Sequence, residues 1–284
     1  MKNLESISNN LDFLSQFNLL ANQVVEGFIS GIHKSPFHGF SSEFAEHKMY
    51  NLGENTKNID WKIYAKTDKL YTKKYDDETN LRCHIIMDNS ASMHYPKNNS
   101  QSFPNNKIQY SCLFAAAILK IIKKQRDAAG LTIFSNQIDF QTKELGNEKH
   151  HRLLIQKLNE TYVNTPIKQQ TAIIDTLHEV AKNIHKRSMI MLFSDMLQSK
   201  SETEKLIEAL QHLKYNKHKV VLFHVHDKKT ELDFNFNNNA KKFVDVETGE
   251  TINLYADQVQ EKYKEEIEKY FKEIETTCQH YKID

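Results

Sequence analysis

The chain has 284 residues, enough for one large domain or two modest ones, and 39% of them are hydrophobic, so it can bury a substantial core. Its 38 basic and 37 acidic residues nearly cancel, which argues against a general nucleic-acid-binding surface. No window approaches the roughly 18 consecutive apolar residues of a membrane span, and the first residues lack the apolar region of a signal peptide, so we expect a cytoplasmic protein.

The first 80 residues predict a helix followed by a small β-rich segment. Apolar residues recur at helical spacing from about Leu11 to Ile29, and Gly31 is a plausible helix end. Residues 43–50 and 70–75 have the composition of strands, and residues 59–62 resemble the start of a short helix. We assign residues 1–80 to this N-terminal part.

From residue 81 onward, short apolar runs alternate with amphipathic segments. Strands are expected at 83–87, 129–135, 189–193 and 220–225, with 137–140 as a hairpin partner of the second; helices are expected at 108–124, 149–158, 171–184, 202–213 and 258–281. A hairpin turn is expected at 246–251. Because strands that alternate with helices form parallel sheets covered on both faces, residues 81–284 predict an α/β, doubly wound, mainly parallel sheet.

Polar side chains follow two of the expected strands. Asp88, Ser90 and Ser92 come after the first strand, Asp195 comes after the third, and Thr171 opens a helix between them. The carboxyl ends of parallel strands meet at one edge, where ligands bind, so these five side chains should converge. Two carboxylates and three hydroxyls suit a hard cation such as Mg²⁺. Alone, the first group could equally be a turn that caps a helix.

This combination resembles the metal-ion-dependent adhesion site of von Willebrand factor A domains. Segments before the first strand resemble one bacterial branch of these domains, the domain of unknown function 58 family; they are 35–39, 43–46, 59–62 and 75–81. The resemblance runs from about residue 20 to the end of the chain. It implies the von Willebrand A fold and a non-catalytic, metal-dependent role in protein binding.

The resemblance also implies roles for individual residues. Ser90 and Ser92 would bind the metal directly, Thr171 would bind it conditionally, and Asp88 and Asp195 would hold charge and waters. The metal would be Mg²⁺, or another divalent cation such as Mn²⁺ or Ca²⁺. A Glu or Asp of a partner protein would complete the coordination, and a MoxR-type AAA+ ATPase is the partner that the resemblance implies.

The chain departs from the family pattern in three places. Two glutamines precede Thr171 where many such domains have glycines, so Thr165 remains an alternative ligand. Met196 follows Asp195 where glycine is usual. The sequence also stops at Asp284, about where the family begins another strand, so either the sheet lacks an edge strand or the sequence is shortened.

Two other kinds of site compete with this interpretation. A Mg²⁺-dependent hydrolase or phosphatase could use Asp88, but the sequence contains no phosphate-binding loop or serine-hydrolase motif, and Ser90 stands where such phosphatases have a second aspartate. His224 and His226 face one side of a strand and could bind zinc with Asp227, although hydrogen-bonded positions at a strand end are commoner. The pair His150 and His151 begins a helix, and we expect it to be solvated.

Overall fold

The computed structural model of the chain describes all residues except 1–16, 20, 23–43, 51–58, 76–80, 97–104, 164–171, 198–199, 237–240 and 246–248. The chain divides into two units. One comprises residues 32–81, and the other comprises residues 1–31 together with 82–284.

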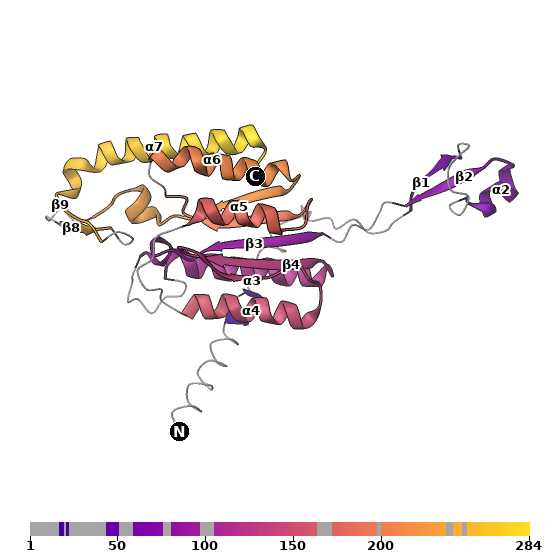
Figure 1. Ribbon diagram of the computed structural model, residues 1–284, viewed down its shortest axis with the longest axis horizontal. Helices are drawn as coiled ribbons and strands as arrows, with labels where there is room; N and C mark the ends of the chain where they lie inside the picture. The colour runs from indigo at the N-terminus through magenta and orange to yellow at the C-terminus, as the bar shows by residue number, and fades with distance from the viewer. Residues whose placement is uncertain are drawn as a thin grey trace, which may run out of the picture. The chain divides into compact units, whose positions relative to one another are not determined.

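The large unit is built on a five-stranded sheet with the order β5-β4-β3-β6-β7 (Figure 1). Its strands are β3 (Arg82–Asp88), β4 (Ala128–Phe134), β5 (Ile138–Gln141), β6 (Met189–Ser194) and β7 (Lys219–His224). Four strands run parallel, and β5 runs antiparallel to β4 as a hairpin. This is the mainly parallel sheet that the alternation of elements predicted.

Helices cover both faces of this sheet, as Figure 1 shows. On one face lie α3 (Lys107–Lys124) and α4 (Glu148–Val163); on the other lie α5 (Ile173–Asn183), α6 (Lys200–Tyr215) and α7 (Ala256–Tyr281). The predicted α/β, doubly wound fold is therefore confirmed. Asn106 caps α3, because its side chain accepts a hydrogen bond of 3.0 Å from the backbone N–H of Gln109.

The core lies between the sheet and its helices. Ile86 and Leu192 are fully buried against helices α5 and α6, and Leu177 and Leu210 belong to the same apolar cluster. On the α3 face, Phe193 and Phe223 come from neighbouring strands and stack with ring centroids 4.4 Å apart. Both strands therefore hold apolar side chains on each face, as buried parallel strands do.

The described residues of the small unit form a two-stranded antiparallel sheet and one helix. Its strands are β1 (Phe44–Met49) and β2 (Tyr71–Tyr75), and the helix is α2 (Trp61–Thr67). Asp60 caps the helix by accepting hydrogen bonds from the backbone N–H groups of Lys62 and Ile63. The expected strands and short helix are thus all present.

The segments after β7 contain more regular structure than the sequence indicated. A π-helical turn, η3 (Lys228–Leu232), follows β7, and then β8 (Lys241–Val244) pairs antiparallel with β9 (Thr251–Leu254). These two strands flank the expected hairpin turn, of which residues 246–248 lie outside the described residues. At the chain end, the backbone of Asp284 pairs with the outer edge of β7 by donating to Val220 O and accepting from Leu222 N.

Part of the predicted N-terminal helix lies within the described residues. Residues 17–19 and 21–22 are helical, with the ring of Phe17 packed edge-on against that of Tyr162 at a centroid distance of 5.3 Å, whereas the rest of the predicted helix at 11–29 lies outside the described residues.

The prediction that His150 and His151 are solvated is wrong, because both are buried. His150 Nε2 lies 3.0 Å from the carbonyl oxygen of Ala129 in β4, so the helix turns this residue toward the sheet.

None of the described helices combines the length and the apolar content that crossing a membrane would require.

Candidate metal centre

Asp88 ends the middle strand of the sheet, and the residue is only 2% exposed. The preceding run of apolar and β-branched residues favours a buried strand, which carries the carboxylate to the carboxyl edge. Oδ1 accepts a hydrogen bond of 2.9 Å from the backbone N–H of Ser90. Oδ2 accepts one of 2.7 Å from the hydroxyl of Ser194. Both carboxylate oxygens are therefore held in place by the protein.

The two serines of the motif bring their hydroxyls together. Ser90 Oγ and Ser92 Oγ lie 3.0 Å apart, with Ser90 fully buried and Ser92 partly exposed. Ser92 begins the short 3₁₀ turn η2 (Ser92–His94), which curls back over the end of β3. His94 Nε2 lies 2.9 Å from Asn89 Oδ1 and ties this turn to the strand end. The turn thus presents two hydroxyls beside a carboxylate.

Asp195 reaches the same edge from the neighbouring strand. It directly follows Ser194, the last residue of β6, and is 3% exposed. Because Ser194 donates to Asp88, the two strand ends are joined by a hydrogen bond. The structure therefore places Asp88, Ser90, Ser92 and Asp195 at the same edge of the sheet.

The threonine positions, Thr171 and Thr165, lie outside the described residues. The residue after Thr171 is described, and its position is informative. Ala172 donates its backbone N–H to the carbonyl oxygen of Ser135 at 2.7 Å, directly after the end of β4. Because β4 is the immediate neighbour of β3, α5 begins at the edge that carries Asp88.

The pKa of the Asp88 carboxyl depends on its buried surroundings. Burial raises the pKa of Asp88 from its ordinary 3.8 to about 6, and the negative charge of Asp195 raises it in the same direction. Hydrogen bonds from Ser194 and Ser90 act against this rise. A like charge disfavours the ionised form of a carboxyl group, so a cation between Asp88 and Asp195 would relieve this repulsion.

A buried lysine that the sequence did not single out contacts this cluster. Lys107 Nζ lies 2.9 Å from Asp195 Oδ2 and 2.5 Å from Glu231 Oε1. Burial alone would lower the pKa of Lys107, but the charges of Asp195 and Glu231 outweigh burial and raise it. No sequence motif marks Lys107 or Glu231, because 124 residues separate them and each lies in a polar stretch. Ser194 was also missed, although it precedes a predicted ligand at a strand end.

Comparison with known proteins places the chain in a family. Residues 46–273 match the family described as "Protein of unknown function DUF58". The chain is a member of the DUF58 family. No sequence among curated proteins matches it.

Several solved structures resemble this DUF58 chain. BatB from Bacteroides thetaiotaomicron, described as a conserved hypothetical protein, is 12% identical with a TM-score of 0.43, over 65% of this chain and 84% of that one. An aerotolerance-related membrane protein from Bacteroides fragilis is 14% identical with a TM-score of 0.40, over 63% and 84%. Proximal thread matrix protein 1 from the mussel byssus is 16% identical with a TM-score of 0.32, over 50% and 37%.

The donors of the DUF58 site fit a hard divalent cation. Carboxylate and hydroxyl oxygens are the ligands that Mg²⁺ prefers, and the repulsion between Asp88 and Asp195 favours a cation there. Within the described part of the chain, no three His, Cys, Asp or Glu side chains are placed to hold a metal ion together. Asp88 and Asp195 offer two carboxylates, and Ser90 and Ser92 offer two hydroxyls, as candidate oxygen ligands at this edge.

The zinc alternative at His224 and His226 finds little support in the described residues. His224 Nε2 lies 2.9 Å from the carbonyl oxygen of Asp195, which confirms its predicted place as a hydrogen-bonded strand-end residue. The carboxylate of Asp227 instead caps η3 by accepting from Thr230. His226 differs from the prediction, because neither of its buried ring nitrogens has a hydrogen-bond partner in the described part of the chain. Burial, followed by the charges of His224 and Lys107, lowers its pKa to about 3, which keeps the ring neutral.

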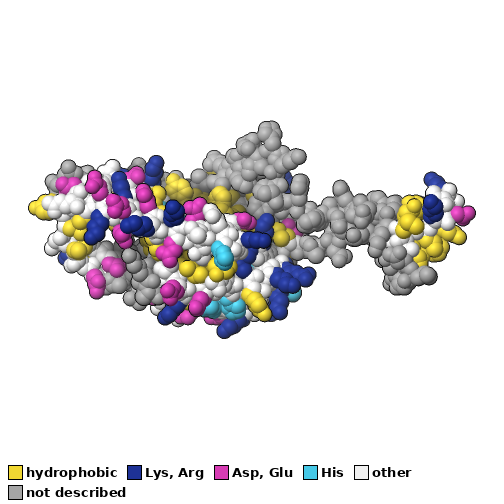
Figure 2. Space-filling model, turned by 90° about the horizontal axis from the view of Figure 1, so that it is seen from above, with side chains coloured by type: hydrophobic (Ala, Val, Ile, Leu, Met, Phe, Trp, Pro, Cys, Tyr) yellow, Lys and Arg dark blue, Asp and Glu magenta, His cyan; other side chains and the backbone are white. Residues whose placement is uncertain are grey.

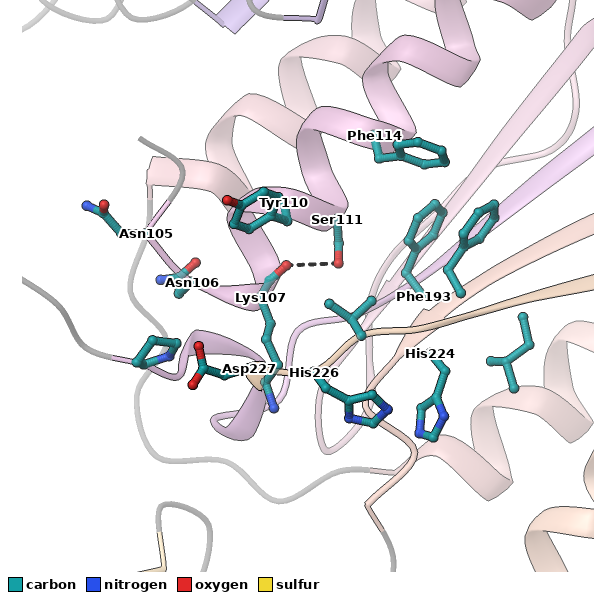
Figure 3. Close-up of a pocket in the computed structure, with 14 residues that line it drawn as sticks. Asn105, Asn106, Lys107, Tyr110, Ser111, Phe114, Phe193, His224, His226 and Asp227 are labelled. Carbon is teal, nitrogen blue, oxygen red and sulfur yellow. Dashed lines mark hydrogen bonds between the residues drawn. The ribbon is translucent and has the colours of Figure 1, made fainter. Parts of the chain in front are cut away.

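A cavity of about 570 Å³ adjoins the site between α3 and the end of β7 (Figure 3). Phe114, Phe193 and Phe223 form part of its apolar lining, and Lys107 and His224 line the side near Asp195. The edge that carries the carboxylates is thus continuous with a hollow that could accept an apolar side chain. Elsewhere, on the face in Figure 2, Lys and Arg side chains mingle with Asp and Glu side chains.

Proposed function

We propose that this DUF58 chain is a non-catalytic protein-binding module whose binding depends on a divalent cation. The observation that carries the proposal is the convergence of Asp88 and Asp195, from adjacent strand ends, beside the paired hydroxyls of Ser90 and Ser92. Strand ends of an open α/β sheet are the usual place for a ligand. The aromatic cavity beside them supports a protein ligand, because it could receive a neighbouring apolar residue.

The candidate ligands would have different roles in binding the ion, which would be Mg²⁺ or, instead of it, Mn²⁺ or Ca²⁺. The hydroxyls of Ser90 and Ser92 would bind the ion directly, with Thr171 or Thr165 as a conditional ligand. The carboxylates of Asp88 and Asp195 would balance its charge. The bound cation would supply an open position that a Glu or Asp of the partner fills, because Mg²⁺ keeps exchangeable ligands.

The partner that we propose is a MoxR-type AAA+ ATPase, in a chaperone-like or complex-assembly task in the cytoplasm. This part of the proposal rests on the family resemblance alone. A pull-down of the purified ATPase by this chain in Mg²⁺ and in EDTA tests it. Capture in Mg²⁺ that chelation abolishes supports the partnership, and equal capture in both would contradict it.

The metal site itself is tested by substitution of Asp88. We expect Asp88→Ala to abolish Mn²⁺ binding measured by isothermal titration calorimetry, because the site loses one of its two carboxylates. Ser188→Ala is the matched control, since Ser188 is a buried, hydrogen-bonded serine at the opposite end of the neighbouring strand β6. Circular dichroism confirms that each variant folds. Undiminished binding by a folded Asp88→Ala variant would defeat the proposal.

The alternative reaction is tested with the same protein. A Mg²⁺-dependent phosphatase that uses Asp88 would release phosphate from p-nitrophenyl phosphate in wild type and lose this activity in Asp88→Asn. We expect no Asp88-dependent turnover. Turnover that Asp88→Asn removes would show an enzyme instead of a binding module.

A further inference from the structure

A buried ammonium group contacts one of the candidate metal-site carboxylates. The side chain of Lys107 is 2% exposed, and its Nζ forms ion pairs with Asp195 at 2.9 Å and with Glu231 at 2.5 Å. These three side chains come from separate elements: the first turn of α3, the residue after β6, and η3. Tertiary structure alone brings them together.

The surroundings of Lys107 distinguish it from the other ion pairs on α3. The pair formed by Lys123 and Glu148 is half-exposed, so water and salt screen its charges. Lys107, in contrast, is shielded from solvent, and a charge in such a place acts strongly on its neighbours. Because the ammonium group of Lys107 lies against Asp195, its positive charge would repel a metal ion bound to the same carboxylate.

Counting charges shows what this lysine does to the site. Asp88, Asp195 and Glu231 carry three negative charges when ionised, and Lys107 carries one positive charge, so the group holds a net charge of about −2. A divalent cation would neutralise that group. Without Lys107 the net charge is about −3, and the attraction for any divalent cation is greater.

We propose that Lys107 sets the affinity of the site by competing with a divalent cation for Asp195, and that Glu231 moderates this competition by binding the same ammonium group. The inference rests on the proposed metal site and deepens it. In the protein without metal, Lys107 is the cation that Asp195 binds. On metal binding, Asp195 turns from the ammonium group toward the ion, and Glu231 retains Lys107.

The proposal gives opposite signs for two substitutions. Lys107→Met removes the competing charge and should tighten Mn²⁺ binding by about tenfold or more, a change of about 1.4 kcal/mol. Glu231→Gln removes a negative charge and leaves Lys107 wholly to Asp195, so it should weaken Mn²⁺ binding several-fold. An ion-pair network that serves folding alone would lower stability in both variants and leave the Mn²⁺ affinity unchanged.

The experiment is calorimetric titration of Mn²⁺ into the full chain. Wild type, Lys107→Met and Glu231→Gln are compared with Lys123→Met, a half-exposed lysine on the same helix whose loss should leave the Mn²⁺ affinity as it is. Lys107→Gln is the second variant, because it removes the charge but keeps a hydrogen-bond donor should Lys107→Met fail to fold. Circular dichroism without metal reports on folding.

The outcomes separate this inference from the proposed function. Tighter binding by a Lys107 variant together with weaker binding by Glu231→Gln supports the competition. If wild type binds Mn²⁺ and the Lys107 and Glu231 variants bind it equally well, the competition is overturned while the metal site stands. If neither wild type nor any variant binds Mn²⁺, both are overturned.

Discussion

Ser194 directly precedes Asp195, one of the two candidate metal-site carboxylates, and contacts the other, Asp88. Its hydroxyl donates to Asp88 at 2.7 Å and accepts from the backbone N–H of Met196 at 2.9 Å. It therefore joins the end of β3 to the loop that carries Asp195. Candidate ligands such as Asp88 and Ser90 can be found from the motif in the sequence. A supporting residue such as Ser194 is recognised only from its contacts in the structure.

We expect Ser194→Ala to lower the free energy of unfolding by about 1–3 kcal/mol, because a buried carboxylate oxygen and a backbone N–H lose their partner. Urea denaturation measures this loss. Ser111→Ala is the control: its buried hydroxyl donates to the carbonyl oxygen of Lys107 one helical turn earlier and joins no two elements, so its removal should cost less. Equal losses in the two variants would contradict the structural role of Ser194.

Whether a histidine is buried or exposed depends on the packing of the element that carries it. His150 and His151 follow each other at the start of α4, and their position in the sequence favoured solvation. Both are buried, because α4 lies against the sheet and turns its first residues toward β4.

At the scale of elements, the pairing of β3 with β4 depends on a close approach between a glycine and a histidine. His84 is held on both sides, by Glu144 at 2.6 Å and by Thr132 at 2.8 Å. A Cβ on Gly130 would lie 2.5 Å from Nδ1 of His84 and 3.0 Å from its Cε1. The ring cannot withdraw without breaking its hydrogen bonds.

Gly130→Ala should therefore destabilise the protein by about 1–3 kcal/mol or more, the range found for overpacked cores. Chemical denaturation measures the change. Gly146→Ala is the matched control, because the nearest atom to its added Cβ is the Asp127 carbonyl oxygen at 3.5 Å, an ordinary contact. A Gly130→Ala variant as stable as Gly146→Ala would show that the strands shift to make room.

For the molecule as a whole, buried histidines make stability depend on pH. Burial lowers the pKa of His151, and it also lowers the pKa of His218. Between the ordinary histidine pKa of 6.5 and the lower folded value, the unfolded chain binds more protons than the folded chain. The stabilisation is fully present above pH 6.5 and is lost as the pH falls below it. Asp88 acts with the opposite sign, because its folded pKa of about 6 exceeds its ordinary 3.8.

A comparison of variants isolates the histidine contribution. We expect the free energy of unfolding of His151→Leu to fall less than that of wild type between pH 7.5 and pH 5.5, because the variant lacks one group that takes up a proton on unfolding. Asp88 contributes equally to both proteins and cancels in the difference. Urea unfolding at the two pH values measures it. Parallel pH profiles would mean that His151 titrates alike in the folded and unfolded chains.

The order of the elements and the class of fold follow from local sequence pattern alone. Apolar runs of strand length alternate with helical segments, and burial of their apolar faces leaves few arrangements other than a parallel sheet between helices. The sequence also indicated that Asp88 and Asp195 would meet, because both directly follow buried strands and such strand ends share one edge. These are consequences of local pattern, which the order of residues carries.

The surroundings of those carboxylates depend instead on how distant elements pack together. Lys107 and Glu231 lie in stretches without a motif, and they reach Asp195 because α3 and η3 pack beside the ends of β6 and β7. The burial of His150 and the approach of Gly130 to His84 arise in the same way. Such contacts depend on how separate elements pack. The spacing of residues along the chain does not encode the distance between side chains of different elements.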